Sequence, residues 1–213
     1  MIAGAGSMTT RIGVLALQGD VREHLQALAA VGAQGVPVRR PEEVDQLDGI
    51  ILPGGESTTM DKLSRIFGVR EPLVQALRNG LPAYGSCAGM ILLADQVLDG
   101  TDDQQTFGGL DITVRRNAFG RQVESFETDL DLDLVGESND PFHAVFIRAP
   151  WVEKVGREVQ VLGRVRHPSA SDGEPIVVAV RQGSLLATAF HPEVSADLRL
   201  HAYFARMVQQ SAT

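Results

Sequence analysis

The stretch Leu81-Pro82-Ala83-Tyr84-Gly85-Ser86-Cys87-Ala88-Gly89-Met90 contains the only cysteine of the chain. A short apolar run ends in Gly-Ser, and the residues after Cys87 are typical of a helix, so the stretch predicts a strand, a sharp turn and a helix. The turn leaves no room for a large side chain, which explains the small residues on both sides. At the start of the helix, backbone N–H groups and the helix dipole would favour the reactive thiolate.

A free cysteine is more often a buried hydrophobic residue than a nucleophile, so Cys87 alone leaves both interpretations open. A second signal lies far downstream, where the apolar run 185–190 ends in His191-Pro192-Glu193. Histidine can accept a thiol proton and return it to a leaving group, and Glu193 can accept the other ring N–H. His-x-Glu alone is more often a surface pair, but with Cys87 it forms a nucleophile, base and orienting residue.

A third element is the stretch 48–58, which combines a buried type of strand, a glycine turn and the start of a helix. Gly54 and Gly55 would let backbone N–H groups approach a ligand closely, as an oxyanion hole requires. Pro-Gly-Gly is also an ordinary turn. Ser57 or Thr58 would cap the following helix.

With these motifs in place, the chain resembles class I glutamine amidotransferases, in which a Gly-x-Cys-x-Gly turn is paired with a distant His-x-Glu. The resemblance is closer to one family among them, the glutaminase subunits of pyridoxal 5′-phosphate synthase (the PdxT/SNO family). The motifs of that family occur in this chain in the same order. They lie at residues 13–19 and 22–24, 52–60, 85–89, 116–122 and 124–127, 146–150, and 190–193. The motifs Arg-Asn-x-Phe-Gly-Arg-Gln, Phe-Ile-Arg-Ala-Pro and Pro-Gly-Gly-Glu-Ser-Thr are more specific than the cysteine turn and His-x-Glu.

This resemblance implies an enzyme that hydrolyses L-glutamine to glutamate and ammonia. Cys87 would be the nucleophile, His191 the general base and acid, and Glu193 the residue that orients His191. The ammonia would pass to a pyridoxal 5′-phosphate synthase subunit in a hetero-oligomeric complex, where it is built into pyridoxal 5′-phosphate, the active form of vitamin B6.

The resemblance also implies binding positions. The glutamine contacts of the family fall on Gly55, Glu56, Ser57, Arg116, Ile147 and Arg148. Candidates for the oxyanion hole are Gln18, Gly54, Gly55 and Ala88, and the Gln18 position is linked in the family to docking of the partner. An arginine can grip an α-carboxylate through its planar fork, which suits Arg116 and Arg148, although composition alone would favour solvent-facing charge.

The order of elements predicts a single-domain α/β protein with the flavodoxin-like fold of class I glutamine amidotransferases, a central, mostly parallel sheet flanked by helices. The apolar run 12–17 is typical of a parallel strand covered on both faces. Helices are expected at 21–31, 57–67, 71–78 and 196–210. Further strands are expected at 35–39 and 49–52, and short strands with turns at 112–115, 122–128, 143–148, 159–165, 175–180 and 185–190. We expect the glutaminase domain to cover 11–213 and residues 1–10 to be a disordered extension. The 99–107 loop is expected to lie away from the motifs.

Composition narrows the function classes. The formal net charge of −8 argues against binding to nucleic acid or a membrane surface. One cysteine excludes an internal disulfide and lacks the spacing partners of a zinc site, so we expect no metal and no cofactor. No apolar run suits a membrane-spanning helix or a signal peptide, and a cytoplasmic protein is expected.

Three alternatives stay open at this point. The chain could be a glutaminase that serves another synthase, which the Arg-Asn-x-Phe-Gly-Arg-Gln motif argues against. It could be a catalytically silent partner-binding subunit, which the joint presence of Cys87, His191 and Glu193 disfavours. It could also be a cysteine hydrolase that needs no partner, but such enzymes do not usually take their base from a late His-Pro-Glu.

Overall fold

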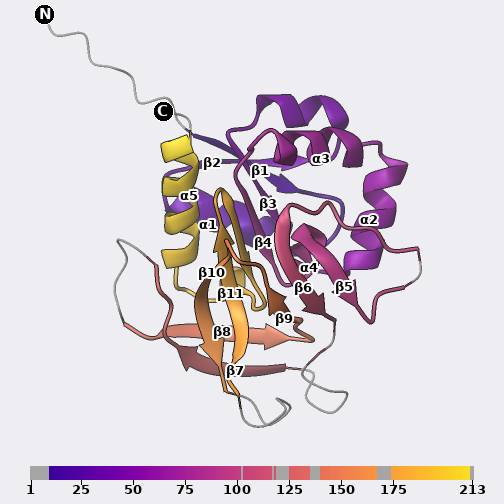
Figure 1. The fold of residues 1–213 in the computed structure, drawn as a ribbon. Coiled ribbons are helices and arrows are strands. Elements are labelled where there is room, and N and C mark those ends of the chain that lie inside the picture. The colour runs from indigo at the N-terminus through magenta and orange to yellow at the C-terminus, as the bar shows by residue number, and fades with distance from the viewer. Residues whose placement is uncertain are drawn as a thin grey trace, which may run out of the picture.

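The computed structural model describes residues 10–101, 103–116, 118, 125–134, 140–166 and 174–211. Residues 1–9, most of the expected disordered extension, lie outside the described residues. Within the described ranges the chain forms a mixed α/β structure with a central sheet flanked by helices (Figure 1). The expected fold class is confirmed.

Ten strands of the described residues form one sheet, whose first half is parallel throughout. Its order there is β2 (Gln34–Val38), β1 (Arg11–Leu15), β3 (Gly49–Leu52), β4 (Ala83–Ser86) and β12 (Leu185–Thr188). All residues of β3, β4 and β12 are buried, as expected for parallel strands covered on both faces.

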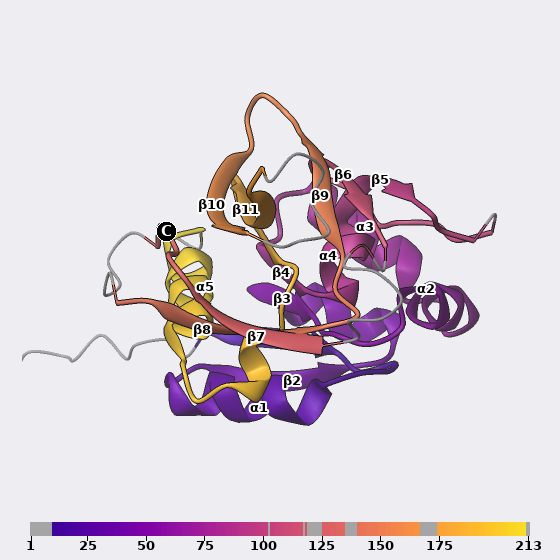
Figure 2. The ribbon, with the colours of Figure 1, turned by 90° about the horizontal axis from the view of Figure 1, so that it is seen from below.

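The second half of the sheet is mainly antiparallel. It continues through β11 (Ile176–Gln182), β9 (Trp151–Val155), β6 (Leu110–Arg115) and β5 (Ala94–Leu98), and β10 (Gln160–Val165) pairs with β11. Only β5 and β6 run parallel here. A separate antiparallel pair, β7 (Ser125–Leu130) and β8 (Phe142–Ile147), lies across the lower end of the molecule in Figure 1 and nearest the viewer in Figure 2.

The helices cover both faces of the parallel strands. On one side α1 (Val21–Ala30) packs against α5 (Arg199–Ser211), and on the other lie α2 (Ser57–Ile66), α3 (Arg70–Arg78) and α4 (Ala88–Leu93) (Figures 1 and 2). Two 3₁₀-helices, η1 (Pro41–Gln46) and η3 (Pro192–Val194), complete the described helical elements. The last helix begins at Arg199 and not at 196, because the Asp197 carboxylate accepts a hydrogen bond from the Arg199 N–H at 3.0 Å and so caps its first turn.

The topology places the predicted motifs at one edge of the sheet. Because β1, β3, β4 and β12 are parallel neighbours, the segments that follow their carboxyl ends meet there. These segments contain Gln18, Gly54, Cys87 and His191. This is the edge at which open α/β sheets bind ligands.

Candidate active site

Cys87 lies on a strained turn between β4 and α4. Its φ of 47° is in the left-handed region, which costs a non-glycine residue of order 1–3 kcal/mol. The Cys87 N–H donates to the Thr188 carbonyl at 2.8 Å, which ties the turn to β12. A Cβ on Gly85 would come within 2.4 Å of the Gly89 backbone, and one on Gly89 within 2.0 Å of the Leu52 oxygen. The small residues around Cys87 are therefore required by close packing, as predicted from the sequence.

His191 and Glu193 meet beside this turn. The Nδ1 atom of His191 lies 2.8 Å from Glu193 Oε1, and both residues are buried. The Cys87 side chain is among the groups that raise the pKa of the His191 ring, so it interacts with that ring. Since a carboxylate can only accept, Nδ1 carries the hydrogen and Nε2 is the ring nitrogen available for proton transfer. The sequence-predicted set of Cys87, His191 and Glu193 is thus brought together.

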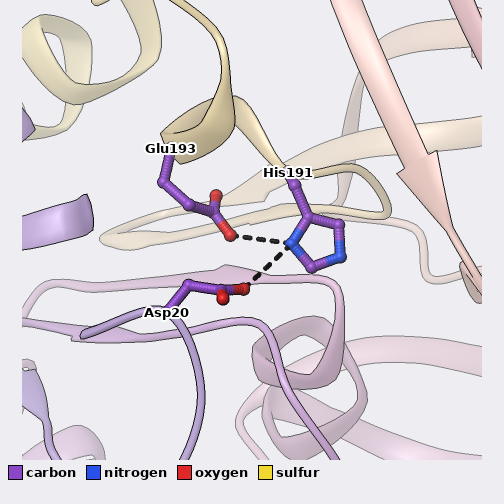
Figure 3. Close-up of side chains that lie close together, drawn as sticks. All are labelled: Asp20, His191 and Glu193. Carbon is purple, nitrogen blue, oxygen red and sulfur yellow. Dashed lines mark hydrogen bonds and ion pairs between the residues drawn. The ribbon is translucent and has the colours of Figure 1, made fainter. Parts of the chain in front are cut away.

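A second carboxylate, Asp20, faces the same ring nitrogen. Its Oδ2 atom lies 3.3 Å from His191 Nδ1, and Figure 3 shows it below Glu193, directed at the same nitrogen. Asp20 was not predicted from the sequence, although it directly follows Gln18-Gly19 in the segment after β1. Hydrogen bonding to His191 lowers the pKa of Asp20 despite partial burial, so Asp20 carries a negative charge beside the ring.

The two carboxylates change the charge state of the histidine. Burial disfavours the imidazolium, but hydrogen bonds to Asp20, Cys87 and Glu193 outweigh it and raise the pKa of His191 to about 12. Burial raises the pKa of Glu193, and the bond to His191 opposes that shift. His191 is therefore held in its protonated form, beside the charged Asp20 carboxylate.

The glycine turn after β3 packs against this group. A Cβ on Gly54 would lie 2.4 Å from His191 Cε1, so only glycine leaves room for the ring. Gly55 has a φ of 152°, and a Cβ there would lie 2.4 Å from Gln18 Oε1. That oxygen accepts the Glu56 N–H at 2.7 Å, and the Asp20 N–H donates to the Gly54 carbonyl at 3.2 Å. The oxyanion-hole candidates Gln18, Gly54 and Gly55 therefore lie on two adjoining loops. The fourth candidate, Ala88, directly follows Cys87.

Four of the predicted glutamine contacts are connected through Arg116 and the start of α2. Arg116 Nη2 lies 3.0 Å from Glu56 Oε1, and the Glu56 carboxylate also accepts N–H bonds from Thr58 and Thr59. These bonds lower the pKa of Glu56 against the effect of burial. Gly55, Glu56, Ser57 and Arg116 thus border a single polar patch.

The 99–107 loop reaches this patch, contrary to expectation. Gln104 Oε1 accepts from Arg116 Nη1 at 2.6 Å, and Gln104 Nε2 donates to Ser57 Oγ at 2.9 Å. The prediction that this loop lies away from the motifs is wrong. The Gln105 N–H donates to the buried Asp61 carboxylate on α2, and this bond keeps the loop in contact with the helix.

Ile147 and Arg148 border the site from β8. The Ile147 carbonyl lies 3.8 Å from Cys87 Sγ, and the neighbouring Val145 carbonyl accepts the His191 N–H at 2.9 Å. Arg148 is exposed and has a φ of 45°, a left-handed conformation at the end of the strand. Residues 117 and 119–124, which include most of the Arg-Asn-x-Phe-Gly-Arg-Gln motif, lie outside the described residues.

Asp20, His191 and Glu193 are also the one group in the described part of the chain whose metal-ligating atoms converge, within 4.8 Å of one another. Their short hydrogen bonds already account for that convergence, so we assign no metal to them. No helix within the described ranges is long and apolar enough to cross a membrane.

Known proteins with similar sequences support one family. The model of the SNO glutamine amidotransferase family matches residues 14–210. A protein of Paenarthrobacter aurescens named "Pyridoxal 5′-phosphate synthase subunit PdxT" is 62% identical over 217 residues, covering 95% of this chain and 93% of the relative. A protein of the same name from Acidothermus cellulolyticus is 62% identical over 202 residues, covering 95% of each chain.

Solved structures agree with this result. A crystal structure described as a glutamine amidotransferase superposes with a TM-score of 0.82 at 45% identity, covering 93% of this chain and 98% of that one. PurLQS from Thermotoga maritima superposes with a TM-score of 0.64 at 20% identity, covering 96% of this chain and 97% of that one, which shows a shared fold.

Proposed function

The chain belongs to the SNO glutamine amidotransferase family, and we propose that it hydrolyses L-glutamine for a pyridoxal 5′-phosphate synthase with Cys87, His191 and Glu193 as its catalytic group. The observation that carries this proposal is the strained turn that presents Cys87 to a histidine whose other nitrogen is bound by a buried carboxylate. Fold alone would not assign the activity.

The geometry fits acyl transfer through a thioester. The Cys87 thiolate attacks the side-chain amide carbon, a C–S bond forms, and the carbonyl electrons move to oxygen. The tetrahedral intermediate collapses, the C–N bond breaks, and His191 Nε2 gives its proton to the departing nitrogen, which leaves as ammonia. Water, deprotonated by His191, then attacks the γ-glutamyl thioester, the C–S bond breaks, and glutamate leaves.

Backbone N–H groups near Gly54, Gly55 and Ala88 are the proposed donors to the oxyanion. We propose that Gln18 controls them. Its side-chain oxygen accepts the Glu56 N–H, and the N–H of Asp20, two residues further on, donates to the Gly54 carbonyl. Such donors act most strongly when they are fixed before charge develops.

The polar patch next to Cys87 suits the amino-acid end of glutamine. Arg116 offers a planar guanidinium for the α-carboxylate, and Glu56 offers an anion for the α-ammonium group. Gly55, Ser57, Ile147 and Arg148 border the same space in the proposal. The pairing of Arg116 with Glu56 at 3.0 Å means that one zwitterionic substrate can contact both charges.

We further propose that the chain works in a hetero-oligomeric complex with the synthase subunit, which consumes the ammonia. The printed names of the relatives, each a subunit of pyridoxal 5′-phosphate synthase, support this partner. We also propose a cytoplasmic location, because a thiolate nucleophile persists best where thiols stay reduced.

The test measures ammonia and glutamate released from L-glutamine by the purified protein, alone and with the synthase subunit. We expect hydrolysis that rises on mixing and disappears in Cys87→Ala. The wild type and Cys87→Ala are both checked for folding and for binding to the synthase. Folded protein that releases no ammonia in any mixture would instead favour a silent partner-binding subunit.

A further inference from the structure

His24, from the Arg-Glu-His motif, lies behind the catalytic group and has no role in the mechanism above. It is on α1 and is fully buried. Its Nε2 atom lies 3.1 Å from Ser86 Oγ and 3.5 Å from Glu193 Oε2, and its Nδ1 atom lies 2.9 Å from Nε2 of His201 on α5. Two buried histidines therefore form a row that ends at the carboxylate bound to His191.

Two atoms of this row fix where its hydrogens lie. Among the described residues, neither Glu193 Oε2 nor His201 Nδ1 has a hydrogen-bond partner. Burying a bare ring nitrogen is less costly than burying an unpaired N–H, so the His201 hydrogen is on Nε2 and donates to His24 Nδ1. The His24 hydrogen is then on Nε2, directed at Ser86 Oγ and Glu193 Oε2.

We propose that His24 is a positioning residue that holds the free oxygen of Glu193, so that the other oxygen stays aligned with His191, and that His201 fixes the tautomer of His24 for this purpose. The proposal rests on the proposed role of Glu193. The 3.5 Å separation between His24 Nε2 and Glu193 Oε2 is longer than a good hydrogen bond, and catalytic contacts often shorten when substrate is bound.

The surroundings of the row support this assignment. Burial lowers the pKa of His24 well below its usual value, with His201 and His191 adding to the shift, so His24 is a neutral donor. The titratable groups that face Glu193 are His24 from α1, Asp20 and His191 in the site, and Tyr84 from β4. Tyr84 already bonds Thr188 at 2.9 Å, whereas His24 Nε2 lies 3.5 Å from Oε2.

A packing role alone would explain burial but not the direction of these nitrogens. The two roles are separated by His24→Gln and His24→Asn. The amide nitrogen of Gln is the same number of bonds from Cα as His Nε2, whereas that of Asn is one bond shorter. Both variants keep a polar side chain, and only Gln can reach Glu193.

The experiment has two readouts. The first is the rate at which iodoacetamide alkylates Cys87, the only cysteine, in the isolated protein. The second is kcat and KM for L-glutamine with the synthase subunit. We expect His24→Asn to reduce both the alkylation rate and kcat about tenfold or more with little change in KM, and His24→Gln to restore both.

The outcomes distinguish the two proposals. Equal rates in the Asn and Gln variants, or a loss confined to KM, would overturn the positioning role. Alkylation that follows the expected pattern in a protein without glutaminase activity would instead overturn the proposed function. His143→Gln, at an exposed histidine on β8 paired with Asp129 and Glu127, is the matched control and should change neither readout.

If His24→Asn does not fold, His201→Glu is the second variant, because a carboxylate there accepts the hydrogen of His24 Nδ1 and so takes it away from Nε2. The same fall in alkylation rate is expected. Failure of both variants to fold would show that the pair serves the core and would overturn the proposal.

Discussion

The buried histidine pair makes the fold sensitive to acid, and the size of the effect can be worked out at His201. Burial lowers the pKa of His201 from 6.5 to about 4. Above its unfolded pKa the residue is neutral in both states, and its contribution to stability is complete. As the pH falls, the unfolded chain binds a proton first, so stability is lost until the folded protein also protonates near pH 4. A shift of this size corresponds to about 3 kcal/mol.

His201→Gln removes this titration. Between about pH 7.5 and about pH 4.5 the variant should lose roughly 2–3 kcal/mol less unfolding free energy than the wild type. The assay is urea unfolding followed by circular dichroism at both pH values. Comparing each protein with itself across pH cancels any constant effect of the substitution.

His143 provides a control of opposite sign. Hydrogen bonds to Asp129 and Glu127 raise its pKa, so it contributes stability at low pH that is lost as the pH rises through its folded pKa. His143→Gln should therefore lose more stability on acidification than the wild type. An identical pH dependence in His201→Gln and wild type would refute the reasoning.

Three further predictions concern the site. Gly54→Ala puts a Cβ 2.4 Å from His191 Cε1, so kcat should fall about a hundredfold with the fold intact by circular dichroism; unchanged kcat would show that the ring is not confined. Gln104→Leu removes one of the acceptors of Arg116, so KM for L-glutamine should rise about tenfold at similar kcat, and Gln104→Glu should restore KM. A change in kcat alone would contradict this role. Glu193→Gln should lower kcat at least about a hundredfold in steady-state assays, because an amide no longer stabilises the imidazolium, and near-normal turnover would exclude Glu193 as the orienting residue.

Local patterns in the sequence were sufficient to predict the parallel half of the sheet and the residues at its edge. Cys87 could be predicted because its turn needs Gly85 and Gly89. This steric requirement is local, so it is visible in the spacing of the two glycines in the sequence. His191 and Glu193 were identifiable because an apolar strand ends directly before them. Motifs that follow parallel strands converge without further information about the fold.

Other parts of the fold were missed because no local signal marks them. The strand β5 continues from α4 at Ala94 without a glycine or proline, so the stretch 88–94 looked like helix throughout. The strand β9 at Trp151–Val155 was also not predicted, since only two of its residues, Trp151 and Val152, are even partly buried.

Contacts between distant segments account for what the site analysis missed. Asp20 faces His191, and Gln104 faces Arg116, only because separate loops meet at the sheet edge. His24 and His201 lie on helices at opposite ends of the chain. Nothing in either helical pattern indicates that His24 Nδ1 and His201 Nε2 lie 2.9 Å apart.

Cys87 is expected to form a thioester with the substrate during turnover. Intact-protein and peptide mass spectrometry tests this after acid quench of the protein, synthase subunit and L-glutamine during turnover. A γ-glutamyl group is expected on the peptide that contains Cys87 and should be absent from Cys87→Ala. Glutamine hydrolysis by Cys87→Ala, or an adduct on another residue, would contradict it.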